Sequence, residues 1–231
     1  MSTLYLHGIV PAGTGAIAHL PAHRLVAAGT VAGIATSGPA GFASEAETVA
    51  AVLAHDRLLA GYLARGPVLP VRFGTAFSSS AAVAERLATG AAEATRHLAA
   101  LDGAAEYGLV VEAAPLPARS DPRPDPAPTG GRAFLMQRRD RRDAAHLLAT
   151  GRKAALGRLA AAAAQLSRRS LPRPPRPPRL MALALLMEPA AEAELRALLE
   201  VWQADLPDLT ARLDGPFPAY SFSGHEEVHP V

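Results

Sequence analysis

The chain has 231 residues, which is enough for one large domain or two small ones, and we expect two. It contains no cysteine, which excludes disulfides, thiolate catalysis and cysteine-ligated metal sites. The net charge is only +2, but residues 1–114 carry 6 basic and 8 acidic side chains, residues 115–180 carry 15 and 4, and residues 181–231 carry 2 and 9. This asymmetry indicates either a surface for an acidic partner or a basic middle that the acidic end neutralises within the molecule.

The start of the chain lacks the basic and apolar regions of a signal peptide. No apolar stretch reaches the roughly 18 to 20 residues that a membrane span needs. We therefore expect a cytoplasmic protein without a membrane partner.

The first 114 residues mix strand and helix patterns, which predicts an α+β domain. Ser44 followed by Glu47 is the signature of a capping box, so a helix should start there and run to the stop at Gly66 and Pro67. We expect a second helix at 79–100 and strands at 4–10, 30–38, 68–77 and 105–113, with a loop at 11–23.

The stretch "VLPVRFGTAF" at 68–77 combines strand-forming residues with a proline and an arginine. In a continuous strand, Leu69 and Phe73 would share the core face while Pro70 and Arg72 would share the other. Proline donates no hydrogen bond to a sheet, so the strand should lie at an edge. Arg72 then meets the second domain or a partner, or it is solvated or paired with a local carboxylate.

The second half starts with a Pro-rich linker or loop at 115–131, and the rest, 132–231, forms the second domain. A long helix is expected at 132–169, and the prolines of 171–178 stop it. The apolar run 180–187 is typical of a strand buried on both faces. We expect an amphipathic helix at 195–213, with Trp202 buried, which Pro207 either kinks or splits in two, and then a short strand at 216–222.

Histidines give the only candidates for catalysis or metal binding. The pairs His19/His23 and His225/His229 have a spacing that could hold a metal on a helix, but both lie among prolines and glycines, so we expect no metal site. His55 is either a general base beside Asp56 or, as we favour, a core histidine. Because no nucleotide-binding loop or nucleophile elbow occurs, we expect neither a cofactor nor catalysis.

Four segments together resemble one known family. They are "YLHGIV" at 5–10, "AHDRLLAGYLARGPVLPVRFGTAF" at 54–77, "GRAFLMQRR" at 131–139 and "GPFPAYSF" at 215–222. In order and spacing they resemble the gas vesicle protein F/L family over nearly the whole chain. Phe217 and Ala219 stand where the family usually has tryptophan and proline, and His7 replaces the commoner tyrosine.

The resemblance implies two small α/β domains, the C-terminal one ferredoxin-like, in a protein without catalytic activity. It implies that the chain binds the hydrophobic main shell protein and other accessory proteins, assists the nucleation or assembly of gas vesicles, and is found in the cytoplasm and at the vesicle. The residues that match the family's motifs are candidates for interaction: Tyr5, His55, Leu69, Pro70, Arg72, Phe73, Gly74, Gly215, Pro216, Tyr220 and Phe222.

Two other classes of function stay open at this point. The basic stretch 132–179 is compatible with a nucleic-acid-binding protein, although Phe134 is its only aromatic residue. A ferredoxin-like domain is also compatible with a sensor of small ligands.

Limited proteolysis tests the predicted linker. We expect the first cuts at 115–130, because a Pro-rich segment of this kind makes few buried contacts. Mass spectrometry of the early fragments would identify the sites. Early cleavage inside 44–64 or 195–213 with the linker intact would contradict the predicted boundary.

Overall fold

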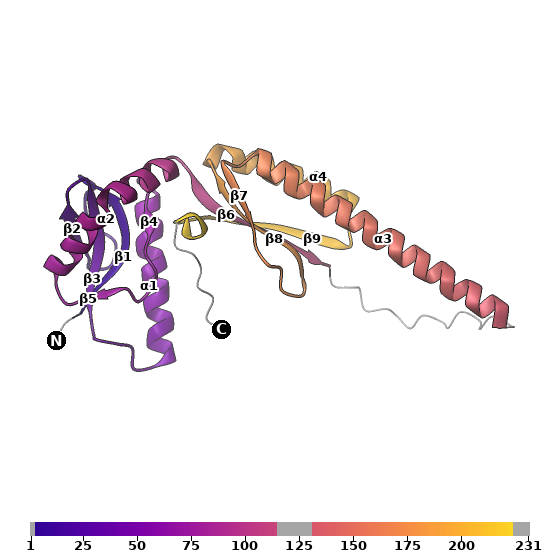
Figure 1. Ribbon diagram of the computed structural model, residues 1–231, viewed down its shortest axis with the longest axis horizontal. Coiled ribbons are helices and arrows are strands. Elements are labelled where there is room, and N and C mark those ends of the chain that lie inside the picture. The colour runs from indigo at the N-terminus through magenta and orange to yellow at the C-terminus, as the bar shows by residue number, and fades with distance from the viewer. Residues whose placement is uncertain (1–2, 115–130, 224–231) are drawn as a thin grey trace. The chain divides into compact units, whose positions relative to one another are not determined.

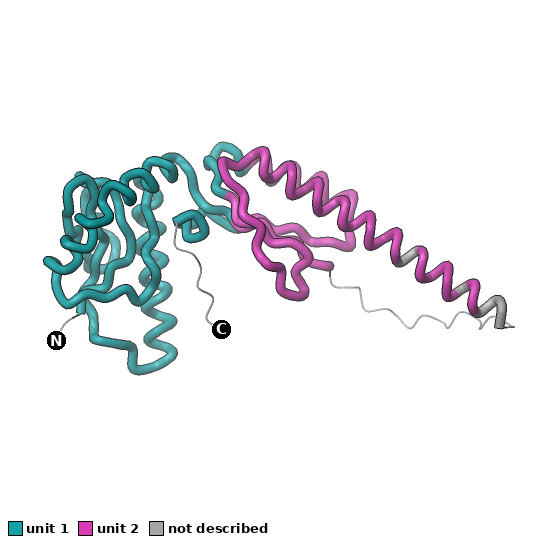
Figure 2. Tube along the Cα trace, in the orientation of Figure 1, with its two compact units in different colours: residues 1–107, 186–192, 214–231 teal, residues 108–185, 193–213 magenta. Residues whose placement is uncertain are grey.

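The computed structural model describes residues 3–114 and 131–223, and in them the chain forms four α-helices and two antiparallel sheets (Figure 1). The predicted α+β class is therefore confirmed. The chain divides into two compact units, unit 1 with residues 1–107, 186–192 and 214–231, and unit 2 with residues 108–185 and 193–213 (Figure 2). The domain limits expected from the sequence remain a prediction, because residues 115–130 lie outside the described parts.

The first sheet belongs to unit 1 and has the strand order β2-β3-β1-β4, with β5 also paired to β1. β1 and β3 are the strands expected near the start of the chain, and β2 was missed because it is short. The strands are β1 (Thr3–Pro11), β2 (Arg24–Ala28), β3 (Val31–Gly38), β4 (Leu69–Pro70) and β5 (Ala76–Phe77).

Two helices, α1 (Glu45–Leu63) and α2 (Ser80–Leu101), cover opposite faces of this sheet (Figure 1). Alternation along β3 explains the arrangement. Ile34 packs with the buried residues of α1, whereas a Cβ added at Gly33 would come within 2.8 Å of Leu87 on α2. Both faces are thus core faces, which is why the first five residues of β3, Val31 to Ala35, are all apolar or glycine and all buried.

Both helices start where the sequence predicts. The hydroxyl oxygen of Ser44 accepts a hydrogen bond from the Glu47 backbone N–H at 3.2 Å, and Ser79 accepts one from Ala82 at 3.1 Å. Each bond satisfies a backbone donor that the first helical turn leaves without a partner.

The prediction of one continuous strand at 68–77 is wrong. The pairing with β1 stops after Pro70 and resumes at Ala76, and a turn at 72–75 lies between. The Thr75 backbone N–H donates to the Arg72 carbonyl oxygen at 3.2 Å, and Gly74 has a φ of +84°, which favours glycine. Pro70 is buried rather than turned away from the core, and Arg72 is exposed on the turn.

The second sheet has the strand order β7-β8-β6-β9. β6, expected at the end of the first domain, pairs in this sheet with β8 and β9. The alternation of buried and less buried residues along β6 shows that one of its faces is a core face. The elements are β6 (Ala105–Ala113), α3 (Gly131–Gln165), β7 (Arg169–Pro172), β8 (Arg179–Met187), α4 (Pro189–Asp205) and β9 (Leu209–Phe217).

The long helix α3 buries Ala155, Leu159 and Ala163, while Leu147 and Leu148 are exposed. Within unit 2, Arg152 of this basic helix bonds to Asp208 of the acidic end of the chain. Part of the basic charge in the middle is therefore neutralised inside the molecule. The helix ends four residues earlier than expected, because β7 starts at Arg169.

The predicted helix at 195–213 is correct only in its first half. α4 ends at Asp205, before Pro207, and β9 follows, so that Leu209 and Leu213 are buried in a strand. Trp202 is half-buried rather than buried, and it lines a cavity together with Leu159 of α3. The strand expected at 216–222 is also shorter: β9 ends at Phe217, and a 3₁₀ turn, η1 (Tyr220–Phe222), follows.

A substitution at Gly215 tests how tightly residues 215–222, which we call the closing segment, pack against the rest of unit 1. Its φ is +144°, and an added Cβ would come within 2.6 Å of Tyr107 Cδ1. We expect Gly215→Ala to lower the free energy of unfolding by roughly 2 to 4 kcal/mol, because backbone strain and a clash with a buried ring add. Urea denaturation would measure it. Gly41→Ala is the control, since an added Cβ there meets nothing within 4 Å, and equal midpoints for the two variants would contradict the expectation.

Candidate functional site

Motif residues from distant parts of the chain meet in unit 1 around two buried histidines. His7 lies on β1 and His55 on α1, and their exposed fractions are 8% and 3%. Their Nδ1 atoms lie 2.9 Å apart, so one ring donates a hydrogen bond to the other. His7 stands where the pairing of β1 with β3 shifts register between Leu6 and Gly8. This bulge turns His7 toward α1, whereas Leu6 faces α2.

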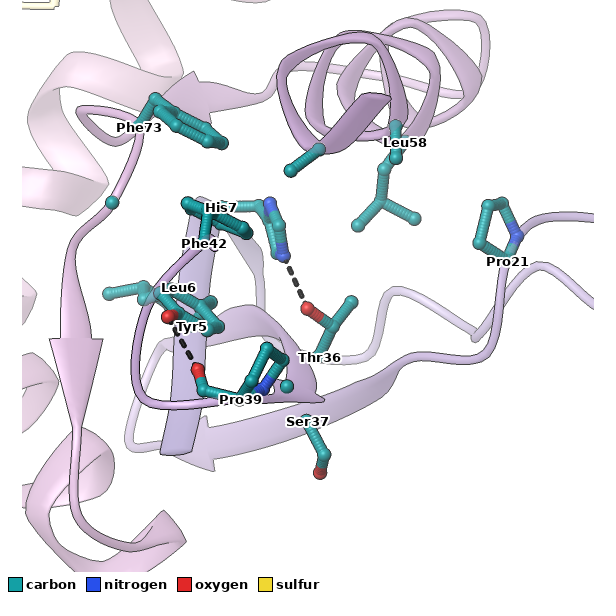
Figure 3. A pocket seen from close by; sticks show the side chains of 14 residues that line it. Tyr5, Leu6, His7, Pro21, Thr36, Ser37, Pro39, Phe42, Leu58 and Phe73 are labelled. Carbon is teal, nitrogen blue, oxygen red and sulfur yellow. Dashed lines mark hydrogen bonds between the residues drawn. The ribbon is translucent and has the colours of Figure 1, made fainter. Parts of the chain in front are cut away.

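The pair is uncharged at neutral pH. Burial, with the nearby His55 and His23, lowers the pKa of His7 from 6.5 to about 4. Burial also lowers the pKa of His55, and this effect outweighs that of Asp56, which acts in the opposite direction. His7 Nε2 lies 2.7 Å from Thr36 Oγ1 (Figure 3), while His55 Nε2 has no hydrogen-bond partner among the described residues.

Aromatic rings extend from the histidines in two directions. Tyr5 stacks on Phe42, and Phe42 stacks on Phe73, with ring centroids 5.8 and 5.7 Å apart. Phe73 meets His55 edge to face at 5.7 Å, and His55 stacks on Tyr220 at 6.3 Å. Offset stacks and edge-to-face pairs at such distances are favourable beyond the area they bury. The five rings connect the opening strand, α1, the 72–75 turn and the closing segment.

The closing segment is also held by hydrogen bonds to carboxylates of unit 1. The Tyr220 hydroxyl donates to Asp56 Oδ1 at 2.6 Å, and the Ser221 backbone N–H donates to Glu106 Oε2 at 2.7 Å. Burial raises the pKa of Tyr220, and the hydrogen bond to Asp56 raises it further, so the phenol stays a donor. Two acidic side chains thus fix a segment that is 164 residues away from Asp56.

A cavity of about 210 Å³ opens beside the aromatic rings on the α1 side of the sheet (Figure 3). Its wall is mostly apolar, and the hydroxyl of Tyr5 at its edge donates to the Pro39 carbonyl oxygen at 2.7 Å. The lining includes Tyr5, His7, Pro39, Phe42, Leu58 and Phe73.

The motif residues divide into a buried and an accessible set. Leu69 and Pro70 of β4 and Phe222 of η1 are buried, and Gly215 and Pro216 lie in β9. Tyr5, Arg72, Phe73, Gly74 and Tyr220 are at least partly accessible. Those that take part in the ring contacts are Tyr5, His55, Phe73 and Tyr220.

Sequence reasoning missed His7, Phe42 and Asp56 as members of the site. His7 drew notice only as a departure from the usual tyrosine, but a histidine within an apolar strand is a signal for a buried polar contact. Phe42 lies in a loop without periodicity, so no pattern could place it.

The arrangement favours packing over acid–base chemistry, because both histidines are neutral and shielded from water. His19 and His23 do not lie on a helix, and the His23 ring bonds to the Tyr62 hydroxyl at 2.7 Å. Within residues 3–114 and 131–223 no group of three or more potential ligands could hold a metal ion. The helices of this part of the chain are too short or too polar to cross a membrane. His225 and His229 lie outside the described residues.

Comparisons with known proteins agree on one family. The family model described as gas vesicle synthesis protein GvpL/GvpF matches residues 3–224. The crystal structure of the gas vesicle protein GvpF from Anabaena sp. PCC7120 is similar over 100% of both chains, with a TM-score of 0.74 and 17% identity. That of GvpF from Microcystis aeruginosa covers 96% of this chain and 98% of its own, with a TM-score of 0.66 and 16% identity. No curated protein matches the chain.

The histidine pair predicts a loss of stability in acid. The pKa of His7 is lower in the folded chain than in the unfolded one, so its contribution to stability is complete above about pH 6.5 and is lost as the pH falls toward 4. We expect the protonation of His7 in the unfolded chain to lower the free energy of unfolding by about 2 kcal/mol between pH 7 and pH 4.5.

Urea denaturation at a series of pH values would measure this loss in the wild type and in His7→Asn, which removes the titrating ring. The decline should be shallower in His7→Asn and unchanged in His97→Asn, which lies outside the pair. Identical slopes for wild type and His7→Asn would show that the buried pair does not cause the loss.

Proposed function

The chain belongs to the gas vesicle synthesis protein GvpL/GvpF family, and from this premise we propose that it binds the hydrophobic main shell protein and assists the nucleation or assembly of gas vesicles. The family is generally non-catalytic, and we propose no enzymatic activity for this chain. Its partners are the shell protein and other accessory proteins, without nucleic acid or membrane, and it acts in the cytoplasm and at the vesicle.

The observation that carries this proposal is the group of accessible motif residues in unit 1, which are Tyr5, Arg72, Phe73, Gly74 and Tyr220. The 72–75 turn lies on the edge strands of the first sheet, and Phe73 and Phe42 stack beside an apolar cavity. Apolar side chains and a strand edge are features with which a protein meets an apolar, strand-forming partner. On α1, Val49 and Leu53 are about half exposed and lie one turn apart, which adds exposed apolar side chains to unit 1.

We also propose that the second sheet with α3 and α4 is a ferredoxin-like domain, with β6 as its first strand. The element order β6-α3-β7-β8-α4-β9 and the sheet order β7-β8-β6-β9 support this. They correspond to a β-α-β-β-α-β unit with two helices and four strands.

The direct test of the function is capture of the shell protein. The affinity-tagged full chain would be co-expressed with the main shell protein of the same vesicle gene set, and the bound fraction quantified by immunoblot. We expect retention above that of an unrelated tagged protein of similar size and charge. Background retention would contradict the proposed function.

Arg72 gives a sharper prediction. Its side chain is exposed, and within the described residues it has neither an ion pair nor a side-chain hydrogen bond. Arg72→Ala should therefore change the free energy of unfolding by about 0.5 kcal/mol or less. We expect it to reduce shell-protein capture and vesicle yield in cells all the same.

A thermal melt and a vesicle-yield assay on the same variant separate the possible roles. Arg65→Ala, on the C-terminal side of α1, is the matched control because Arg65 is also exposed. If Arg72→Ala matches wild type in both assays, the arginine is only a solvated side chain. A large loss of stability would instead assign it a structural role.

A further inference from the structure

A second cavity in unit 1 lies on the other side of the 72–75 turn. It has a volume of about 390 Å³ and runs between α2 and the edge strands β4 and β5. Its α2 wall spans residues 86–97, about 16 Å of helix at 1.5 Å per residue. We call it the α2 groove. A volume of this size suits a few side chains of a partner or a small ligand.

The floor of the α2 groove is apolar and its rim is basic. Leu6, Val71, Phe77 and Leu87 are among the floor residues. The charged and titratable side chains that line it are Arg72, Arg86, His97 and Glu93. The rim carries two guanidinium groups and one carboxylate, so its net charge is positive.

Neither guanidinium is neutralised by the described parts of the chain. No ion pair or side-chain hydrogen bond joins Arg72 or Arg86 to another described residue. In unit 2, by contrast, Arg152 forms an ion pair with Asp208, and Arg179 forms one with Glu112 at 3.4 Å. An arginine held beside an apolar cavity can form bidentate hydrogen bonds with a carboxylate.

Gly90 keeps the groove open. It lies on the α2 wall, one turn after Arg86, and a Cβ added at Gly90 would come within 3.3 Å of the Arg86 guanidinium. The Arg86 guanidinium thus lies close to the position that a side chain at residue 90 would take. Glycine within a helix lowers helix stability, so this opening costs about 1 kcal/mol relative to alanine.

We propose that the α2 groove binds a segment of the shell protein in which a carboxylate stands beside apolar side chains, with Arg86 and Arg72 holding the carboxylate and the floor covering the apolar groups. This inference rests on the proposed function, since it names the contact by which the shell protein is held. It assigns a role to α2, which none of the sequence motifs includes.

Two changes on α2 test the groove. Gly90→Leu should fill it, and because leucine favours the helix more than glycine, the melting temperature should equal or exceed that of the wild type. Arg86→Glu reverses one rim charge on an exposed side chain. We expect each variant to reduce capture of the co-expressed shell protein at least tenfold.

Matched controls lie on the exposed face of the same helix. Ala92→Leu adds a leucine outside the groove, and Arg96→Glu reverses a charge outside it. Both should capture the shell protein within twofold of wild type. A charge swap completes the design: in a scan of Glu→Lys and Asp→Lys variants of the shell protein, one should restore capture by Arg86→Glu.

The outcomes separate this inference from the proposed function. If the wild type captures no shell protein, the proposed function fails and the inference with it. If the wild type captures it and both groove variants capture it equally well, only the inference fails. If no charge swap restores capture, the paired carboxylate is wrong. If dodecanoate raises the melting temperature of wild type but not of Arg86→Glu while capture is unchanged, the groove binds a small amphiphile, and the inference is also overturned.

Discussion

The hydrogen bonds from β1 to both ends of the 72–75 turn are the constraint on which the rest of unit 1 depends. The Val71 N–H donates to the His7 carbonyl oxygen and the Leu6 N–H donates to the Thr75 carbonyl oxygen, each at 2.9 Å. The turn is therefore anchored on both sides and projects from the sheet edge. Its first two side chains belong to different faces: Arg72 lines the α2 groove, and Phe73 joins the rings on the α1 side.

The α1 side is held together by the burial of neutral groups. A charged imidazole would be costly between β1 and α1, and the hydrogen bond between the two histidines satisfies one nitrogen of each. The carboxylates of Asp56 and Glu106 accept hydrogen bonds from the closing segment. These hydrogen bonds between polar groups thus help to fix the positions of the stacked rings.

Much of the fold follows from local sequence, and the errors have physical causes. Ser44 and Ser79 cap their helices through short-range bonds, so both starts are readable from sequence. Leu209 and Leu213 are four residues apart, a spacing that places them on one face of a helix or of a strand, so Pro207 is the only local signal that the helix ends before them.

The site was only partly predictable for a similar reason. The family motifs include Tyr5, His55, Phe73 and Tyr220; the last three are in ring contact through His55, and Tyr5 joins them only through Phe42. The turn at Gly74 was read as strand, because neighbouring residues favour strands and only the φ of one glycine breaks the pattern. The α2 groove depends on which residues face one another across a helix and a sheet edge, and no local pattern records that.

The return of the closing segment to unit 1 has a consequence for the timing of synthesis. Tyr220 and Ser221 bind Asp56 and Glu106, so the surface around His55 is incomplete until a ribosome has made the whole of unit 2. At about 5 to 20 residues per second, the delay between residues 107 and 214 is roughly 5 to 20 seconds. The ring contacts around His55 in a nascent chain would thus stay incomplete for seconds, until synthesis has passed Ser221.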